Sequence, residues 1–327
     1  MRILHNSVPF EIFLQKLPLS ICGLTLGLGA LGNLMLAYSK MFHWIYISMA
    51  AILWLLLVLK LIFCWPQAQQ ELKNPLNFSV FEAFFMTLLQ ISAAIAPYFY
   101  QSAFTLWLVA NIGHAIIVLL FSWYYLRNFQ LQNVFATWNV LYGGNMLSAV
   151  VSVSFQMQHV GQWILWIGFF LFLPWYFVAA YRYYKLPVTD AALPTVCIFS
   201  APFNLALAAY LSCTAQPSFT IALLFAAIGQ SAYIFVLCCL PRILRLPFYS
   251  SYGALTFPFV IPAVALEKLL HTLNTAGTQQ LAFWNIIVRI EESISIVMVT
   301  YVLLRYLYFL WGIAQSTRKE TVRPPGL

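Results

Sequence analysis

Long apolar stretches, separated by short polar ones, run through almost the whole chain. A helix that crosses a bilayer needs about 20 predominantly apolar residues, and ten stretches come close to that length. We therefore expect an all-α integral membrane protein with ten transmembrane helices. The predicted spans are Leu17–Ala37, His43–Phe63, Phe78–Ile95, Tyr98–Ser122, Val134–Ser154, Gln162–Ala180, Ala192–Ser212, Ser218–Leu240, Tyr252–Leu270 and Ala282–Leu310.

The polar residues predict how these spans are organised. Residues 1–16 form an N-terminal segment, residues 17–311 the membrane domain and residues 312–327 a C-terminal tail. Most of the 16 basic residues fall at the two termini and after even-numbered spans. Because cytoplasmic loops carry an excess of Lys and Arg, both termini are expected in the cytoplasm. That orientation requires an even number of spans, arranged as five helical hairpins.

Composition agrees with the membrane class and excludes several others. The chain is 63% hydrophobic and only 7% charged, whereas soluble domains carry about 25% charged residues. Its net charge is +8. The basic residues lie in short loops, and they are not interleaved with aromatic residues in the way that is typical of nucleic-acid binding. The six cysteines show no disulfide or metal-ligand spacing, and no catalytic or phosphate-binding motif stands out. We expect no enzyme, no cofactor, no metal and no nucleic-acid partner.

Glycine and proline are concentrated in the odd-numbered spans. Glycine allows close approach of backbones, and backbone freed by proline is tolerated in a membrane only against protein or a water-filled cavity. The odd spans are therefore predicted to form an inner layer around a path, with the even spans outside them facing lipid. Ordinary kinked packing is the alternative. The residues are Gly23, Gly27, Gly29, Gly32, Gly143, Gly144, Pro194, Pro202, Gly253, Pro258 and Pro262.

Several short motifs, taken in order, resemble one family. They are "LPLSICGLTLGLGALGN" from Leu17, "NPLNFSVFEAFF" from Asn74, "LYGGNMLSA" from Leu141, "SAPFNLALAAYLS" from Ser200 and "ALTFPFV" from Ala254. The chain resembles the TehA-like members of the tellurite-resistance/dicarboxylate transporter family, which includes the plant slow anion channels. The resemblance implies five hairpins with quasi-fivefold symmetry, a pore lined by odd helices in each subunit, a homotrimer and a bacterial inner membrane.

Phe257 is the candidate pore gate, because the resemblance places it where the family has a pore-plugging phenylalanine. An apolar constriction can close a pore by steric block or dewetting. The alternative is that Phe257 is one of 28 phenylalanines that pack between helices. The candidate pore kinks are Pro258, Pro262, Pro202, Gly143 and Gly144.

The sequence departs from the family at three positions where a mid-membrane proline is usual. These positions hold Thr25, Phe85 and Val140, so the resemblance does not predict kinks there. Thr25 and Phe85 are candidate pore-lining residues, and so are Asn145 and Asn204. For these side chains, packing or hydrogen bonding between helices is the alternative role.

Four charged residues inside predicted spans are candidates for proton or charge coupling, because intramembrane charge is costly. Glu82 lies near the start of the third span, where the alternative is an interfacial pair with Lys73. In the last span, Arg289 and Glu292 are three residues apart and can pair, with Glu291 beside them. The alternative places this cluster at the outer interface or between subunits.

The predicted function is passage of small anions through a gated pore in each subunit. The alternative is a proton-coupled secondary carrier for dicarboxylates or oxyanions, including efflux of the tellurite-resistance type. A membrane scaffold without an open path is a third class. The predicted partners are small inorganic or organic anions and the lipid bilayer.

Overall fold

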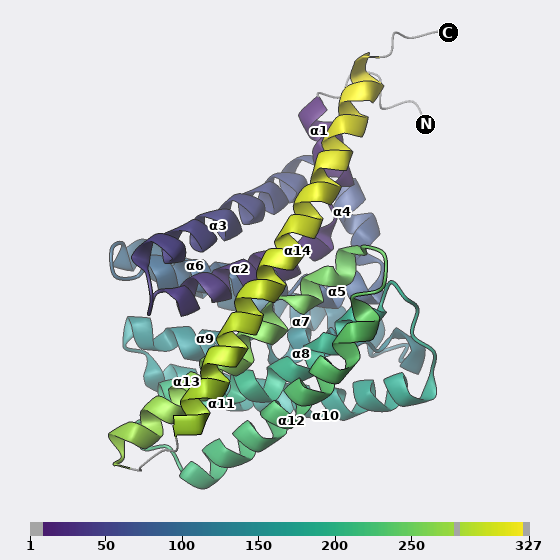
Figure 1. The fold of residues 1–327 in the computed structure, drawn as a ribbon. Helices are drawn as coiled ribbons and strands as arrows, with labels where there is room; N and C mark the ends of the chain where they lie inside the picture. The colour runs from purple at the N-terminus through teal and green to yellow at the C-terminus, as the bar shows by residue number, and fades with distance from the viewer. Residues whose placement is uncertain (1–8, 278–281, 323–327) are drawn as a thin grey trace.

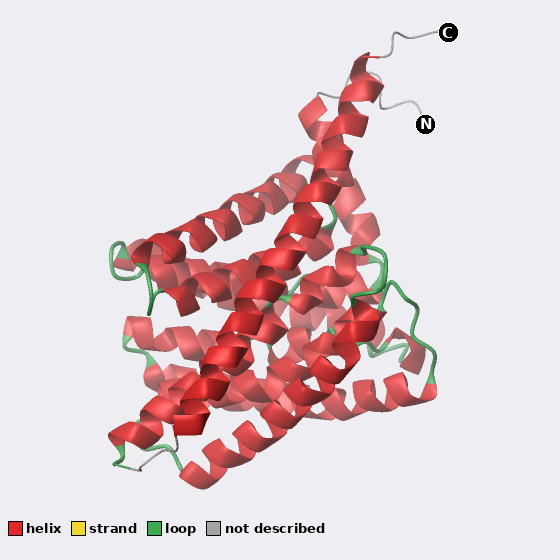
Figure 2. Cartoon of the chain, in the orientation of Figure 1, coloured by secondary structure: helices red, strands yellow, loops and turns green. Residues whose placement is uncertain are grey.

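The computed structural model describes residues 9–277 and 282–322, and within them the chain is built from helices and loops without strands (Figures 1 and 2). Elements marked η are 3-10 helices. In chain order the elements are α1 (Pro9–Lys16), η2 (Leu19–Ile21), α2 (Cys22–Met35), α3 (Lys40–Phe63), α4 (Trp65–Leu72), α5 (Pro75–Val80), α6 (Ala83–Ile95), α7 (Tyr100–Tyr125), η3 (Leu131–Asn133), α8 (Trp138–Gly143), α9 (Met146–Val151), η4 (Ser152–Phe155), α10 (Gln158–Lys185), η5 (Leu193–Ser200), α11 (Ala201–Cys213), α12 (Phe219–Ile243), η6 (Ser250–Leu255), α13 (Phe257–Thr275) and α14 (Ala282–Val322).

Eight helical segments within the described residues are long and apolar enough to cross a membrane. A ninth is obtained if α1 and the η2–α2 segment, which meet at a bend of 78°, are counted as one span. The predicted fifth span differs from the expectation of one continuous helix. It consists of the six-residue helices α8 and α9 followed by η4, with a break at Gly144 and Asn145. The last helix is longer than predicted, because α14 continues through Val322 into the predicted tail.

Burial alternates along the chain. Pro75–Ile95, Leu193–Cys213 and Ser250–Thr275 are 78%, 89% and 83% buried over their apolar windows. Nearly all of α2, α8 and α9 is buried as well. By contrast, α3, α7, α10, α12 and α14 are only 22–39% buried. The chain therefore has an inner set of segments and an outer set, which correspond to the odd and even predicted spans.

The inner segments form a closed ring. Helix α2 contacts α6, α6 contacts α9, α9 contacts α11, α11 contacts α13, and α13 returns to α2. Each outer helix packs against the inner segment that precedes it in the chain, as α3 does on α2 and α14 on α13. These contacts place the ring in the interior and the five outer helices around it.

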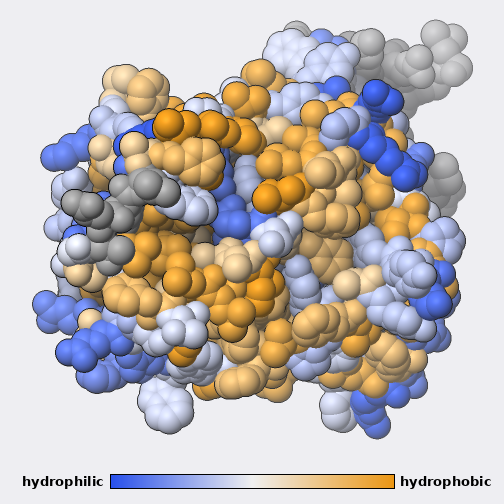
Figure 3. All heavy atoms as spheres, turned by 60° about the horizontal axis from the view of Figure 1, so that its bottom comes forward, coloured by the Kyte–Doolittle hydropathy of each residue, from blue (hydrophilic) through white to orange (hydrophobic). Residues whose placement is uncertain are grey.

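The outer helices give the molecule a hydrophobic surface. Leu119 of α7, Trp163 of α10 and Tyr308 of α14 are among many large exposed apolar or aromatic side chains. One face of the molecule shows broad areas of such side chains, with hydrophilic groups mainly toward its margins and in a recess (Figure 3). A soluble protein rarely exposes so much contiguous apolar surface, so this surface fits contact with lipid.

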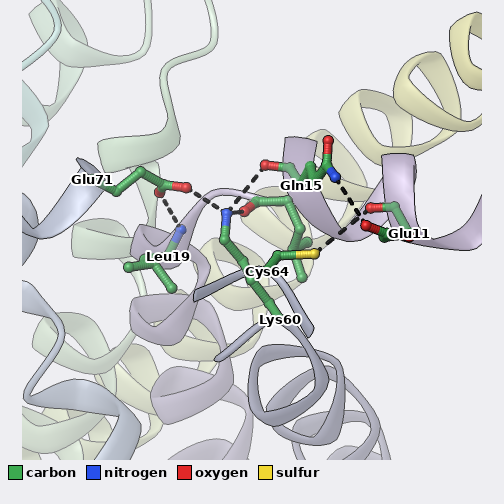
Figure 4. Close-up of polar contacts among 7 residues, drawn as sticks. Glu11, Gln15, Leu19, Lys60, Cys64 and Glu71 are labelled. Atoms are coloured by element: carbon green, nitrogen blue, oxygen red, sulfur yellow. Dashed lines mark hydrogen bonds and ion pairs between the residues drawn. The ribbon is translucent and has the colours of Figure 1, made fainter. Parts of the chain in front are cut away.

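A buried ion pair holds the sharp corner between α1 and η2. Lys60 of α3 is fully buried, and its ammonium contacts Glu71 Oε1 and donates to the backbone carbonyls of Leu17 and Gln15 (Figure 4). The other oxygen of Glu71 accepts from the Leu19 N–H at 2.8 Å. Helix ends leave backbone groups unpaired. Lys60 and Glu71 therefore provide hydrogen-bond partners for backbone groups at the end of α1 and at the start of η2.

Candidate pore

Two cavities lie along the axis of the inner ring. The wider one has a volume of about 470 Å³ and is lined by the C-terminal halves of all five inner segments. Its lining is apolar apart from a few polar groups, including Asn33 of α2, Gln90 of α6, and Glu267 and Lys268 of α13. Asn33 Nδ2 donates to Gln90 Oε1 at 2.5 Å, which ties α2 to α6.

The second cavity is small, about 40 Å³, and lies among the N-terminal halves of the same five segments. Glycines and prolines form much of its wall, so backbones approach it closely. The residues lining it are Gly23, Leu26, Val80, Ala83, Met86, Asn139, Val140, Gly143, Gly144, Ile198, Ala201, Pro202, Leu205, Gly253, Ala254, Phe257 and Pro258. Every inner segment contributes to this lining.

Phe257 borders both cavities. Among the described residues it is the one that lines both of them, and its side chain is only 5% exposed. Phe257 begins α13, directly after the chain leaves η6 at Thr256. The Thr256 hydroxyl is bound to the carbonyl oxygens of Gly23 and Gly253, at 2.8 and 2.7 Å, and this fixes the turn that presents the ring.

Pro258 and Pro262 were both predicted as pore kinks, but they lie at different places in α13. Pro258 lies in the first turn of α13, where the missing N–H costs no helical hydrogen bond. Pro262 is inside the helix and cannot donate to the carbonyl of Pro258, four residues earlier. The Ser200 hydroxyl donates to that carbonyl instead, at 2.7 Å. Pro202 likewise lies in the first turn of α11, after η5. The breaks therefore fall between 3-10 and α-helical halves, and Pro258 and Pro202 mark where the second halves begin.

Comparison with protein families agrees with this geometry. A family model described as "voltage-dependent anion channel" (SLAC1) matches residues 16–307. The chain belongs to this voltage-dependent anion channel family. Comparison with curated proteins finds no match. Membership in the voltage-dependent anion channel family makes transport of anions across a membrane the activity class, rather than enzymatic catalysis.

In this member of the anion channel family, four predicted pore-lining residues do not line either cavity. Phe85 packs its ring on Gly113 of α7, Asn145 lies on Gly168 of α10 and Asn204 lies on Gly229 of α12. In each case a side chain of an inner segment meets a glycine of an outer helix. Thr25 instead joins α2 to α6 through a hydrogen bond with Thr87 of 2.8 Å. All four contacts fit the alternative of interhelical packing and bonding.

Glu82 is also turned away from the cavities. It is 1% exposed, and its Oε1 lies 2.7 Å from Nδ1 of His114 on α7. The predicted alternative partner, Lys73, does not take this place. The break between α5 and α6 falls at Phe81 and Glu82, so the third span is interrupted without the family's proline.

The charges of the last span form two contacts outside the cavities. Arg289 Nη1 lies 2.9 Å from Glu292 Oε2, as their spacing predicts, and Tyr38 donates to the same oxygen at 2.6 Å. Glu291 is buried, and Gln230 of α12 donates to it at 3.5 Å. Of the predicted residues, five therefore line the narrow cavity, whereas Pro262 lies inside α13 and lines neither cavity. The five are Phe257, Pro258, Pro202, Gly143 and Gly144.

Several polar residues that line the cavities, Asn33 and Gln90 among them, were not singled out in the sequence. Asn139 lines the narrow cavity, and Glu267 and Lys268 line the wide one. Asn139 immediately precedes Val140, one of the three positions that departed from the family pattern. Lys268 lies near the C-terminal end of its predicted span, where a lysine is unremarkable because long side chains reach the membrane interface from there.

Gly27 is predicted to be essential for the position of Phe257. A Cβ atom at Gly27 would fall on the Thr256 side chain and 3.1 Å from the backbone nitrogen of Phe257. Gly27→Ala should lower the free energy of unfolding by about 1–3 kcal/mol through overpacking. Thermal denaturation of the detergent-solubilised protein measures this. Gly312→Ala is the control, because open space surrounds that glycine. Equal loss in both variants would contradict the prediction.

Proposed function

We propose that the protein is a gated pore for small anions within a single subunit, of the TehA and slow-anion-channel type. In this proposal the chain crosses the membrane ten times, as five hairpins with both termini in the cytoplasm. Support for ten crossings comes from the closed ring of inner segments, because α8 and α9 occupy the place of a span in that ring. The packing of each outer helix on the preceding inner segment supports the hairpins.

The observation that carries the proposal is the position of Phe257. Two cavities lined by the same five segments meet at this side chain. In the gating step, rotation of the ring away from the axis joins the cavities, and its return closes them. The apolar walls bind an anion weakly, which suits rapid passage.

The wide cavity has one lysine, Lys268, among its lining residues, and this is the basic group that an entering anion meets. Lys268 makes no ion pair with a carboxylate within the described part of the chain, although Glu267 is its neighbour in the sequence. Its ammonium places a positive charge in the wide cavity, beside the negative charge of Glu267. On the basis of the resemblance, we also propose that the protein assembles as a homotrimer in a bacterial inner membrane. The mass of the detergent-purified complex tests the trimer.

A proton-coupled carrier is the second candidate, because titratable groups lie in the wide cavity. Glu267 and His271 line it together with Lys268, so a proton could bind beside a transported anion. Glu82, Glu291 and Glu292 are less suited, because they lie outside both cavities.

Measurements on reconstituted wild-type protein separate the two functions. A pore gives chloride currents in a planar bilayer that rise with concentration and persist without a pH gradient. A carrier gives saturable uptake of dicarboxylate into liposomes that depends on a pH gradient. Uptake of the second kind without any current would reject the pore.

A further inference from the structure

An open groove lies between the outer helices α10 and α12 and shares no lining residue with either pore cavity. Its volume is about 1100 Å³. The two outer helices form its walls, and η5 forms its floor through Leu193, Val196 and Phe199. Helices α10 and α12 both pack on α11. An occupant of the groove therefore passes between two outer helices and touches an inner segment.

Aromatic contacts join the α10 wall of the groove to its floor. The rings of Tyr176 and Tyr183 pack edge-on against Phe199, with centroids 5.3 and 5.5 Å apart. The Tyr183 hydroxyl is also hydrogen-bonded to Thr195 Oγ1 of η5 at 2.5 Å. The groove is therefore formed before anything occupies it, and a ligand that enters a preformed site loses less free energy to ordering.

The groove has the length that a lipid chain requires. Its lining on α12 runs from Ala227 to Arg242, a separation of 15 positions that spans about 22 Å at the helical rise. Between these ends α12 contributes mainly apolar side chains, among them Ile228, Ala232 and Phe235. One leaflet of a bilayer has a hydrocarbon layer of about 15 Å. One acyl chain and part of a head group therefore fit along the groove.

Positive charge collects where the groove meets the loop of residues 186–192. Lys185 in the last turn of α10 and Arg242 in the last turn of α12 both line it. Neither makes an ion pair with a carboxylate within the described residues. Arg182, one turn before Lys185, adds a third cation, with its guanidinium 5.2 Å from the centre of the Tyr183 ring. This end of the groove therefore attracts a negatively charged group.

The charges favour an anionic phospholipid over a second copy of the chain. Asp190 is the one exposed acidic residue in the part of the chain that the structure describes, so a second copy offers the two cations little. A phospholipid supplies a phosphate and apolar chains together, and basic pockets between transmembrane helices bind anionic head groups. A choline lipid fits less well, because its own cation meets those of the groove.

We propose that the groove between α10 and α12 binds one anionic phospholipid. Its phosphate contacts Lys185 and Arg242, and one acyl chain lies along α12 against Phe199 of η5. The inference does not depend on what the pore conducts, because it uses only the position of the outer helices in a membrane. Ile198 of η5 lines the narrow cavity, so the lipid braces a pore-lining segment from outside.

Native mass spectrometry of the full chain in detergent tests the site. The probes are palmitoyl-oleoyl phosphatidylglycerol and the phosphatidylcholine with the same chains. Wild type should bind phosphatidylglycerol more tightly. Lys185→Gln/Arg242→Gln should weaken that binding by about 25-fold and leave phosphatidylcholine unchanged, because each basic group near a membrane surface contributes about fivefold. Equal binding of both lipids by wild type would overturn the inference.

Arg127→Gln/Arg245→Gln is the matched control for charge. It removes two exposed basic residues that do not line the groove, and it changes the net charge by the same amount. Binding of phosphatidylglycerol should stay within about twofold of wild type, since exposed charges outside the site are screened by salt. A loss as large as that of the groove variant would show that general surface charge holds the lipid, and the site would be rejected.

A second pair of variants tests the seat of the acyl chain. Ser231→Trp fills the groove from its α12 wall and should weaken phosphatidylglycerol binding about tenfold, because excluding even two CH₂ groups costs that much. Ile234→Trp, on an exposed part of α12 outside the groove, should have no effect. If Ser231→Trp instead breaks an oligomer and leaves lipid binding intact, a second copy occupies the groove and the lipid site is refuted. Either result leaves the proposed pore to its own test by chloride currents.

Discussion

Replacing Phe257 with alanine is expected to raise anion conductance through the reconstituted protein by about 100-fold. The ring is the residue common to the wide and narrow cavities, so its removal joins them without any conformational change. A rate increase of about 100-fold corresponds to removing a barrier of about 3 kcal/mol, a modest value for a steric and dewetted block. Single-channel recording in symmetrical chloride measures the change.

Phe259→Ala is the matched control for this experiment. Phe259 lies two residues further along α13, is fully buried, and packs edge-on against Tyr233 of α12 with ring centroids 5.8 Å apart. It lines neither cavity. Both substitutions delete a buried ring and should cost about 3–5 kcal/mol of stability. Only the change at Phe257 should open the path.

A graded series strengthens the interpretation. Phe257→Leu keeps an apolar but smaller side chain and should give a conductance between wild type and the alanine variant. The gate would be refuted by equal conductance of wild type and Phe257→Ala in protein that is shown to be folded. Equal increases for Phe257→Ala and Phe259→Ala would instead indicate general loosening of α13.

Much of the layered fold could be predicted from hydrophobic runs and from the positions of glycine and proline. Run length cannot locate breaks within a span, however, because an apolar 3-10 segment and an apolar α-helix have the same composition. For this reason the sequence predicted one continuous helix across Gly144 and Asn145, where the structure has a break. The third and fifth spans lack the family's proline, so the sequence did not indicate that these spans are interrupted.

The candidate site was only partly predictable for a related reason. Phe257 was identified through a motif and its place in the chain. The asparagines could not be ranked, because Asn139, Asn145 and Asn204 all lie in apolar spans and their directions depend on the packing of outer helices. Gly168 and Gly229 receive Asn145 and Asn204, and the sequence shows the glycines without showing which side chain meets them.

The environment of Lys60 could not be predicted from its position in the sequence. A lysine at the cytoplasmic end of a span is expected at the membrane surface. Instead its side chain is fully buried at the corner between α1 and η2, with Glu71 only 27% exposed beside it. The difference arises because α1 folds back over the end of α3, which contacts it. Segment 1–16 gave no indication of that contact.

Lys60→Met is therefore expected to be strongly destabilising. The methionine keeps most of the volume but leaves Glu71 without its cation, and the carbonyls of Gln15 and Leu17 without their donor. Breaking a buried ion pair by removing one partner typically costs about 3–5 kcal/mol. The thermal midpoint of the detergent-solubilised protein should fall well below that of wild type.

A double-mutant cycle separates the ion pair from the backbone contacts. Glu71→Gln removes the charge and keeps an acceptor for the Leu19 N–H, so it should cost less than Lys60→Met. In Lys60→Met/Glu71→Gln no unpaired charge remains, and the loss should be smaller than the sum of the two single losses, because directly contacting residues are not additive. Lys40→Met, at the exposed start of the same helix, should change stability by no more than about 0.5 kcal/mol. Strict additivity in the cycle would show that Lys60 acts through the backbone carbonyls and that its pairing with Glu71 contributes nothing.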